Sequence, residues 1–532
     1  MVNKLLLIIS LLLAAVFMST EVTKAQSENV ISINPGQVYQ TINGWEATDY
    51  IAQPDDPADP YLVNPIADKA VNEIGINRIR LEISPGTENT TDYFVQVLSG
   101  QITMVDWVHN YAKSPVNDNS DPNSINLNGF KFTNLDWKID RMVLPLKQRL
   151  EAKGEKLFIN LNFVHFGTSN TAFYQYNNAS EYAEFMLTTY QHMQTKYGFV
   201  PDAIEIELEP SNTDNFSGAE MADAIVATSA RLQANGFAKP YFIVPSDPGM
   251  STSINYYNQI IQNTSAKALI NEFSYHRYWS PNLTDLQTIV SLALRDGKNT
   301  AMLEWWDNQN TYNTLHEDLK IGRNSAWQQE TLRGIVNINS TNPTNPVVTI
   351  ADKSKFTRQY YLYVRSGAQR ISATTPSCSD SQLCTSVDPL AFINSNGKYV
   401  VVVKASAGGS FTVQNLPAGT YGVYYTTPVE YSNTLQDQTI SAGQLLSAAI
   451  PRDGVITIYA KTAAGATPTP IPTSTPNPAD INGSGRVDFN DLKLILSNWL
   501  GLSTCSTFVC DLNNDSKINA LDASLVIVNW GQ

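Results

Sequence analysis

The sequence predicts an α/β protein that combines a (β/α)8 TIM barrel with an accessory β-sandwich and a small C-terminal α-helical domain. Three observations support this architecture. Strand-like apolar runs alternate with amphipathic helical patterns over residues 42–367, short strands with Gly and Asn turns fill residues 369–461, and one twelve-residue pattern occurs twice near the C-terminus. Such changes of periodicity along one chain indicate separate domains.

The alternating region contains eight strand-like runs. They are a short run near Gly44 and residues 75–83, 156–163, 203–209, 241–246, 269–276, 300–306 and 325–332. Helical patterns lie between them at 135–153, 180–196, 217–235 and 356–365. A helix after each strand returns the chain for another parallel strand, so this order predicts a (β/α)8 barrel.

The region from 369 to 461 changes to an all-β pattern. The stretches GKYVVVVKAS, GSFTVQNL, GTYGVYYTT and GVITIYAK are short, rich in β-branched and aromatic residues, and bounded by turn residues. This pattern is typical of a β-sandwich. The strand-like segment at residues 30–38 could join the same sheet from the other end of the chain.

The Pro/Thr-rich run AGATPTPIPTSTPN marks the clearest domain boundary. Such a composition forms an extended spacer rather than a core. We therefore expect a signal peptide at 1–25, the barrel at 30–368, the β-sandwich at 369–462, a linker at 463–478 and the C-terminal domain at 479–532.

The N-terminus has the features of a secretory signal. Lys4 supplies a positive start, residues 5–17 are apolar, and Thr23-Lys24-Ala25 is a plausible cleavage site. An uncleaved anchor is the alternative, but the apolar run is shorter than the roughly 20 residues that a membrane span needs. We expect a secreted, extracellular protein that is soluble after signal removal and works as a monomer.

The charge balance limits the kinds of partner that the protein binds. The net charge is -14, with a pI near 4.9. Nucleic-acid phosphates demand a basic face, so this balance argues against nucleic acid as a partner.

The cysteines form two close pairs, Cys378/Cys384 and Cys505/Cys510. Export favours one local disulfide in each pair. Zinc is disfavoured because the pairs are far apart in sequence and no histidine lies near either of them.

The repeated pattern near the C-terminus is DINGSGRVDFND followed by DLNNDSKINALD. Both copies place oxygen side chains at loop positions 1, 3, 5, 9 and 12, the spacing with which an EF-hand loop surrounds calcium. The predicted metal ligands are Asp480, Asn482, Ser484, Asp488 and Asp491 in the first copy, and Asp511, Asn513, Asp515, Asn519 and Asp522 in the second.

This tail resembles a type I dockerin, since position 12 is Asp rather than Glu and each repeat ends in Asn-Trp. The resemblance implies two structural Ca²⁺ ions, a cohesin domain as a partner, and an origin among secreted carbohydrate-degrading enzymes. It therefore directs attention to sugar chemistry in the barrel.

Two carboxylates stand at the carboxyl ends of predicted barrel strands, where the reacting groups of such enzymes lie. Glu209 ends the run AIEIELE, in which acids alternate with apolar residues, and Glu304 ends a later strand. Paired carboxylates at a barrel rim suit glycosidic bond cleavage, with one acting as the acid and the other as the nucleophile. A salt-bridged rim residue is the alternative for either one alone.

The barrel resembles a clan A retaining glycoside hydrolase, closest to glycoside hydrolase family 30 or a near neighbour. The motifs are QTINGW, GINRIRLEI, Leu208-Glu209-Pro210, SYHRYW, LHEDLKIGRNSAWQ and FTRQYYLYVRSGAQRI. The resemblance implies Glu209 as acid/base and Glu304 as nucleophile, with no cofactor needed for catalysis. It also implies that Arg80 keeps the nucleophile ionised, that Tyr278 donates a hydrogen bond to it, that His276 lies in the site, and that Trp327 forms the floor under the sugar.

One position departs from the family pattern. In the family that the barrel resembles, the position of Leu208 is an asparagine that contacts the sugar 2-hydroxyl. Either another residue supplies this contact, with Asn162 and His165 as the candidates, or the substrate presents a different group there. Sugar rings stack on aromatic side chains, and Trp45, Trp279 and Trp327 are the predicted contacts.

The leading hypothesis is thus a secreted retaining glycoside hydrolase that cleaves β-glycosidic bonds of a polysaccharide and is tethered through the dockerin-like tail. The alternative is a non-catalytic carbohydrate-binding or scaffold-associated barrel protein, which the Leu208 substitution would favour. A different reaction on the same barrel is a third hypothesis, because a fold alone does not fix function.

Overall fold

The computed structural model describes residues 29–166, 176–213, 216–463, 479–481, 487–500, 510–513 and 517–530. It divides into two compact units, Met1–Asn34 with Val38–Ala463, and Pro35–Gln37 with Ala464–Gln532. The predicted signal peptide and the Pro/Thr run at 464–477 lie outside the described residues. No helix in the described part of the chain combines the length and apolarity needed to cross a membrane.

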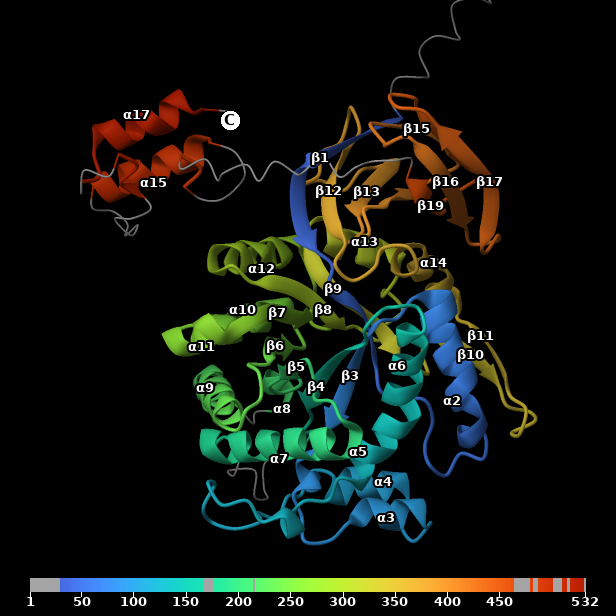
Figure 1. The fold of residues 1–532 in the computed structure, drawn as a ribbon, viewed down its shortest axis with the longest axis vertical. Coiled ribbons are helices and arrows are strands. Elements are labelled where there is room, and N and C mark those ends of the chain that lie inside the picture. The colour runs from blue at the N-terminus through green and yellow to red at the C-terminus, as the bar shows by residue number, and fades with distance from the viewer. Residues whose placement is uncertain are drawn as a thin grey trace, which may run out of the picture. The chain divides into compact units, whose positions relative to one another are not determined.

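A closed barrel of parallel strands forms the centre of the first unit (Figure 1). Its order follows the sequence: β2 (Gly44–Thr48), β3 (Arg78–Ile83), β4 (Phe158–Phe163), β5 (Ala203–Glu205), β6 (Tyr241–Asp247), β7 (Ile270–His276), β8 (Asn299–Glu304) and β9 (Asn324–Thr331). Strand β9 pairs with β2 and closes the ring. The predicted TIM barrel is confirmed, and each predicted run overlaps one strand.

Helices surround this barrel. They are α2 (Asp59–Asp68), α5 (Thr133–Lys138), α6 (Leu144–Glu151), α7 (Ala179–Tyr197), α8 (Pro210–Thr213), α9 (Gly218–Ala234), α10 (Met250–Ile260), α11 (Thr264–Leu269), α12 (Leu283–Asp296), α13 (Tyr312–Lys320) and α14 (Asp352–Tyr361). The segment between β3 and α5 adds α3 (Tyr93–Leu98) and α4 (Met104–Asp106), and β10 (Val336–Asn339) pairs with β11 (Val347–Ile350). π-Helical turns at Lys69–Ile74, Trp107–Tyr111 and Ile139–Val143 continue α2, α4 and α5.

Local sequence explains where the helices begin and end. Ser217 caps α9 in a reciprocal capping box with Glu220, which satisfies backbone N–H groups that have no helical partner. Helices α7 and α12 end at Gly198 and Gly297, both in the left-handed region that glycine adopts without steric strain.

Strand alternation separates the barrel interior from the helix layer. Glu46, Arg78 and Glu272 face inward, where the Arg78 guanidinium binds Glu46 Oε2 at 2.5 Å and Glu272 Oε1 at 2.8 Å, all three fully buried. Such a buried charge is tolerated only when it is paired and hydrogen-bonded. The alternate residues of the same strands pack against the helices in the main apolar core.

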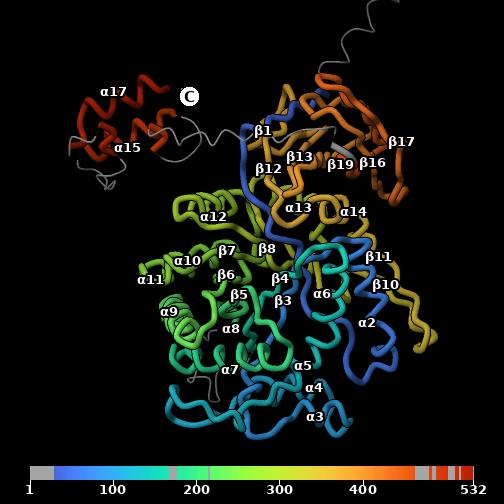
Figure 2. The backbone as a smooth tube through the Cα atoms, viewed as in Figure 1, coloured from blue at the N-terminus to red at the C-terminus, as the bar shows by residue number. Residues whose placement is uncertain are grey.

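A nine-stranded mixed sheet forms the β-domain, in the order β17-β16-β19-β14-β13-β12-β1-β15-β18. The strands are β1 (Val30–Thr41), β12 (Gln369–Thr374), β13 (Val387–Ile393), β14 (Tyr399–Ala405), β15 (Gly409–Gln414), β16 (Gly419–Thr426), β17 (Asn433–Ile440), β18 (Leu446–Ile450) and β19 (Gly454–Ala463). The expected contribution from the N-terminal segment is confirmed, since β1 pairs with β12 and β15. Figure 2 shows β1 beside β12.

This sheet connects two apolar cores. Along β14, Val401 and Val403 point into the core inside the β-domain, whereas Val400 and Val402 belong to the core shared with the barrel. Successive side chains of a strand point to opposite faces, so the four consecutive valines of KYVVVVKA pack on both cores. This packing joins the β-domain to the barrel.

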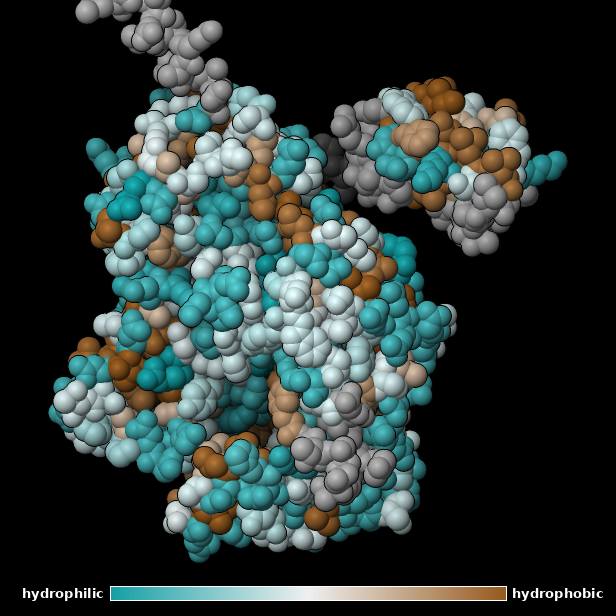
Figure 3. Space-filling view, turned by 180° about the vertical axis from the view of Figure 1, so that it is seen from behind, coloured by the Kyte–Doolittle hydropathy of each residue, from teal (hydrophilic) through white to brown (hydrophobic). Residues whose placement is uncertain are grey.

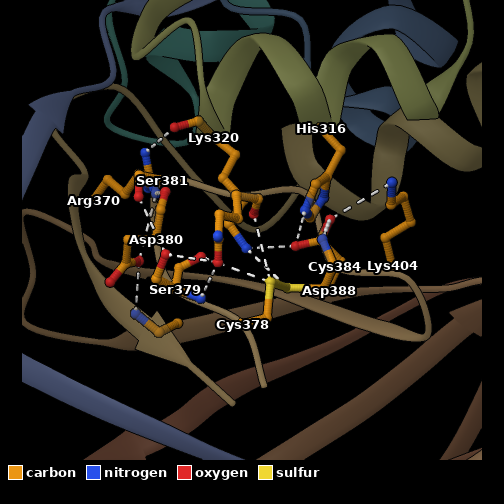
Figure 4. Close-up of a disulfide and its surroundings, with 12 residues drawn as sticks. His316, Lys320, Arg370, Cys378, Ser379, Asp380, Ser381, Cys384, Asp388 and Lys404 are labelled. Carbon is orange, nitrogen blue, oxygen red and sulfur yellow. Dashed lines mark hydrogen bonds and ion pairs between the residues drawn. A yellow bond between two sulfur atoms is a disulfide. The ribbon is translucent and has the colours of Figure 1, made fainter. Parts of the chain in front are cut away.

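A buried charged cluster lies where α13 meets the β-domain (Figure 4). Asp388 Oδ1 accepts a hydrogen bond from Lys320 Nζ at 2.6 Å and lies 3.2 Å from His316 Nε2, while Oδ2 accepts from the Cys384 backbone N–H. Burial is the largest influence on His316 and lowers its pKa to about 4, although Asp388 opposes this shift. The disulfide between Cys378 and Cys384 lies beside this cluster and confirms the first predicted pair. Cys505 of the second pair lies outside the described residues.

The described part of the second unit contains α15 (Phe489–Trp499) and α17 (Ala520–Val528). Each begins with a capping box, Asp488 with Asp491 and Asn519 with Asp522. Val487, Ile495 and Val526 form part of a small apolar core. The two-repeat pattern of the sequence thus corresponds to two similar helix starts.

Candidate active site

The carboxyl ends of the barrel strands bring Arg80, Tyr278 and Glu304 together. Arg80 Nη2 lies 2.5 Å from Glu304 Oε2, and the Tyr278 hydroxyl donates to Glu304 Oε1 at 2.9 Å. Burial would lower the pKa of Arg80, but Glu304, Glu82 and Glu205 raise it. Burial and Glu304 raise the pKa of Tyr278, so its phenol stays protonated. Both carboxyl oxygens of Glu304 are therefore occupied, Oε2 by Arg80 and Oε1 by Tyr278.

Glu209 reaches the same rim by a different route from the predicted one. Strand β5 ends at Glu205 rather than continuing to 209, and Glu209 lies in the left-handed region with φ +53°. Its Oε1 contacts His276 Nδ1 at 2.9 Å, and Asn212 Nδ2 donates to Oε2 at 3.0 Å. A non-glycine residue in this conformation is strained, which is common at functional sites.

Burial raises the pKa of Glu209, but hydrogen bonds and charge from His276, together with Asn212 and Arg80, outweigh burial and lower it. Glu209 and Glu304 are therefore held by different partners. Only 5% of Glu209 and 6% of Glu304 is exposed. The two carboxylates are distinct in environment although they share one small space.

One carboxylate oxygen of Glu209, one of Glu304 and a ring nitrogen of His276 all lie within 4.8 Å of one another. This upper limit is compatible with the roughly 5 to 5.5 Å between the carboxyl groups of retaining glycosidases and is shorter than the roughly 6.5 to 9.5 Å of inverting ones. The same three side chains could share a cation in principle. However, the Arg80 guanidinium already neutralises Glu304 and would repel a metal ion there.

Asn162 lies in strand β4 and His165 two residues after it, and they have different surroundings. Asn162 faces the barrel interior, is fully buried, and has no hydrogen-bond partner for either amide atom within the described structure. His165 Nε2 contacts the Lys113 carbonyl oxygen at 3.2 Å. Leu208 is buried beside Glu209 and offers no polar group.

The prediction that sugars contact Trp45 and Trp327 does not fit their positions, because both rings are fully buried. Alternation turns Glu46 and Gln328 inward, so the neighbouring tryptophans point toward the helices. Trp45 stacks on Tyr361, and Trp327 donates to Asp318. A fully covered ring cannot serve as a sugar platform.

Other tryptophans near the rim are accessible. Trp279 follows β7 and is 46% exposed, and Trp306 follows β8 and is 42% exposed. The Trp306 backbone N–H donates to the Tyr278 hydroxyl at 3.1 Å, which ties this residue to the Glu304 site.

Several polar residues near the site were not predicted as members of it. Glu46, Arg78, Asp247 and Glu272 are buried, Glu82 is half-buried and Asn212 is exposed. For two of these residues, their position in the sequence could have indicated a place in the site. Arg78 lies two residues before Arg80 on the same strand, and Asp247 follows an apolar strand as Glu304 does. No sequence pattern indicated Asn212, because its contact with Glu209 depends on how the backbone turns into α8.

Some of the predicted calcium-loop residues lie in the described part of the second unit. Asp491 and Asp522 are fully buried at position 12, and Asp522 Oδ1 accepts from the backbone of Leu512 and Asn513 at the start of its loop. Asp480, Asp488, Asp511 and Asn519 are also described, whereas Asn482, Ser484 and Asp515 lie outside the described residues. Carboxylate and amide oxygens are hard donors that fit Ca²⁺.

Comparison with solved structures defines the class of the fold. A GH30 endoxylanase from Clostridium papyrosolvens C71 matches with a TM-score of 0.56 and 16% identity, over 81% of this chain and 100% of that chain. A GH30 subfamily 8 xylanase from Clostridium acetobutylicum matches with 0.56 and 16%, over 82% and 100%. An endo-β1,6-glucanase matches with 0.53 and 16%, over 83% and 95%. The first unit therefore has a GH30-like fold.

The C-terminal region is a type I dockerin domain, since the model of that domain matches residues 478–529. No curated protein matches the chain. The chain thus combines a GH30-like fold with a C-terminal dockerin, as the sequence motifs predicted.

Proposed function

We propose that the chain is a secreted glycoside hydrolase that cleaves β-glycosidic bonds of a polysaccharide with retention of configuration. The observation that carries this proposal is the pair Glu209 and Glu304, with carboxylate oxygens within 4.8 Å of each other at the barrel rim. Their partners support different roles, because Arg80 and Tyr278 bind the two oxygens of Glu304, whereas His276 contacts Glu209.

The reaction has two displacements. Glu304 attacks the anomeric carbon and forms an ester bond to the sugar, while the bond to the leaving oxygen breaks and Glu209 gives its proton to that oxygen. Glu209 then takes a proton from water, whose oxygen attacks the same carbon and releases Glu304. Two inversions leave the product with the starting configuration.

The acid role requires a proton on Glu209, although His276 favours its anionic form. The 2.9 Å contact allows one proton to be shared between His276 Nδ1 and Glu209 Oε1. When a sugar oxygen approaches Glu209, the carboxyl form is the useful one, and the histidine is left neutral. We propose that this pair, rather than Glu209 alone, holds the catalytic proton.

Substrate contacts are proposed for accessible or unsatisfied groups. Trp279 offers an exposed face on which a pyranose ring can stack. Asn162 is preferred over His165 as the replacement for the missing asparagine at Leu208, because its buried amide is unsatisfied. Since Asn162 is fully covered, we propose that it reaches a sugar hydroxyl through a water molecule.

The proposal for the tail is that its dockerin domain binds two structural Ca²⁺ ions and docks onto a cohesin domain. Apolar side chains gather on one face of this domain (Figure 3), and several are exposed: Phe489, Trp499, Leu500, Leu521, Ile527, Val528 and Trp530. Such a surface is typical of protein interfaces. A dockerin also suggests an extracellular assembly, which is consistent with the predicted signal peptide.

Hydrolysis of a polysaccharide panel tests this function. The panel should include xylan, β-1,6-glucan and other β-glucans, with wild type, Glu304→Gln and Glu209→Gln. We expect turnover on at least one substrate and its loss in Glu304→Gln with folding intact. Binding without hydrolysis would instead favour the non-catalytic alternative, which the Leu208 substitution still supports.

A further inference from the structure

The end of strand β6 contacts both halves of the proposed site without facing the substrate. Ser246, Asp247, Pro248 and Gly249 connect β6 to α10, and Asp247 is fully buried. Because this turn lies between the segment that carries Glu209 and the segment that carries Tyr278, its hydrogen bonds decide how the two segments are held.

The Glu209 side of the turn is held by backbone and side-chain bonds. The Glu209 N–H donates to the Ser246 carbonyl oxygen at 3.0 Å. Two residues further on, Ser211 donates to Asp247 twice, from its backbone N–H to Oδ2 at 2.9 Å and from its hydroxyl to Oδ1 at 2.8 Å. Asp247 therefore fixes the first turn of α8, which begins directly after Glu209.

The nucleophile side is attached to the same turn. The Tyr278 N–H donates to the Pro248 carbonyl oxygen at 2.9 Å, and Tyr278 is the residue that donates to Glu304. Trp279 packs so closely on Gly249 that an added Cβ there would lie 3.2 Å from the tryptophan Cβ. The turn thus fixes the position of Glu209 relative to the hydrogen-bond partner of Glu304.

Asp247 is itself held rigidly. Its Oδ1 also accepts a hydrogen bond from the Thr252 hydroxyl, and its carbonyl oxygen accepts from the Ser253 hydroxyl at 3.3 Å. Both partners lie in the first turn of α10. Ser246 and Glu209 each adopt a φ of +53°, which is strained for a residue with a side chain. Strained backbone of this kind persists only where the surrounding bonds hold it in place.

We propose that Asp247 is a positioning residue that holds Glu209 in proton-transfer geometry by anchoring the Glu209–Thr213 segment to the end of β6. The inference rests on the proposed function, because it assumes that Glu209 is the acid/base. It predicts that loss of Asp247 lets the Glu209 backbone relax and moves its carboxyl away from the leaving oxygen. Asp247 does not touch the reacting atoms.

Substrates with different leaving groups distinguish a loss of acid catalysis from a general loss of active-site structure. An aryl β-disaccharide with a 2,4-dinitrophenyl leaving group needs no acid, whereas the phenyl analogue does. The sugar is xylobiose or cellobiose, whichever the wild-type full-length protein hydrolyses. For Asp247→Ala we expect kcat/KM on the phenyl substrate to fall about 100-fold, the effect of misplacing a catalytic group by about 1 Å. On the dinitrophenyl substrate we expect it to change by less than about threefold.

Two further variants test the mechanism of positioning. Asp247→Asn can still accept the Ser211 N–H bond and pair with both hydroxyls, so it should restore most of the phenyl activity. Ser211→Ala removes one bond without changing charge and should lower phenyl activity in the same direction by a smaller factor. The control is Asp296→Asn, a buried carboxylate paired with Lys267 and Arg295 away from the site, which should leave the leaving-group ratio unchanged.

Equal losses on both substrates in a folded Asp247→Ala protein, or no loss on either, would overturn the proposal. If the wild type hydrolyses neither disaccharide, a crystal structure still tests the inference, and the polysaccharide panel tests the proposed function separately. In Asp247→Ala we expect the 2.9 Å contact between Glu209 and His276 to be lost. An unchanged Glu209 backbone and contact would contradict the positioning role. If Asp247→Ala does not fold, the leaving-group comparison and the crystal structure are both done with Ser211→Ala.

Discussion

Acidification should destabilise the first unit through His316 before any carboxylate of its cluster is protonated. His316 is fully buried, and burial lowers its pKa from 6.5 to about 4 against the opposing effect of Asp388. In the unfolded chain the imidazole takes up a proton near its ordinary value. Between these two values the unfolded state binds more protons, so the free energy of unfolding decreases as the pH falls from 6.5 to 4.

The size of this effect follows from the width of the window. About 2.5 pH units at roughly 1.4 kcal/mol each give about 3 kcal/mol of stability lost by pH 4. Burial raises the Asp388 pKa, but the charges and hydrogen bonds of His316 and Lys320 outweigh burial and keep this pKa below its ordinary value. Asp388 therefore loses its stabilising charge only below this window.

The assay is urea unfolding in saturating Ca²⁺ at several pH values between 4 and 7, for wild type, His316→Gln and the control His109→Gln, which removes an exposed histidine. We expect the pH dependence of the unfolding free energy to be about 3 kcal/mol smaller in His316→Gln over this range. The control should follow the wild type. Equal pH dependence in all three proteins would refute the assignment of a neutral, buried His316.

Other predictions concern the site and the tail. Tyr278→Phe should lower kcat by roughly 10- to 100-fold on an aryl glycoside, since one donor to Glu304 is lost, and unchanged kcat would contradict its role. Trp279→Ala should raise KM for a polysaccharide by about two- to tenfold through loss of ring stacking, measured by reducing-sugar release. Chelation with EDTA should lower the calorimetric melting temperature of the dockerin domain and leave the transition of the first unit unchanged.

The sequence predicted the architecture well because its physical signals are local and repeated. Strand and helix periodicities alternate through the barrel, and the uninterrupted apolar run in KYVVVVKA is typical of a strand that is buried on both faces. Local spacing likewise identified the dockerin domain and the pair Cys378 and Cys384.

The side-chain directions and the backbone path in the site depend on contacts between residues far apart in sequence, which local sequence patterns do not reveal. The direction of Trp45 and Trp327 follows from which alternate residues enter the barrel, and the neighbours Glu46 and Gln328 took those positions. The extended run to Glu209 was expected to be strand throughout, but the backbone turns after Glu205 because it is bound to Ser246 on the next strand. That bond joins residues far apart in sequence.

The central claim is that Glu304 forms a covalent bond with the sugar while Glu209 transfers protons. Incubation with a 2-deoxy-2-fluoro β-glycoside that carries a good leaving group should trap this intermediate, because the fluorine slows its hydrolysis. Peptide mass spectrometry should then find the fluorosugar on Glu304 in the wild type and no label in Glu304→Gln. A label on Glu209, or hydrolysis to the inverted anomer without any trapped species, would contradict the account.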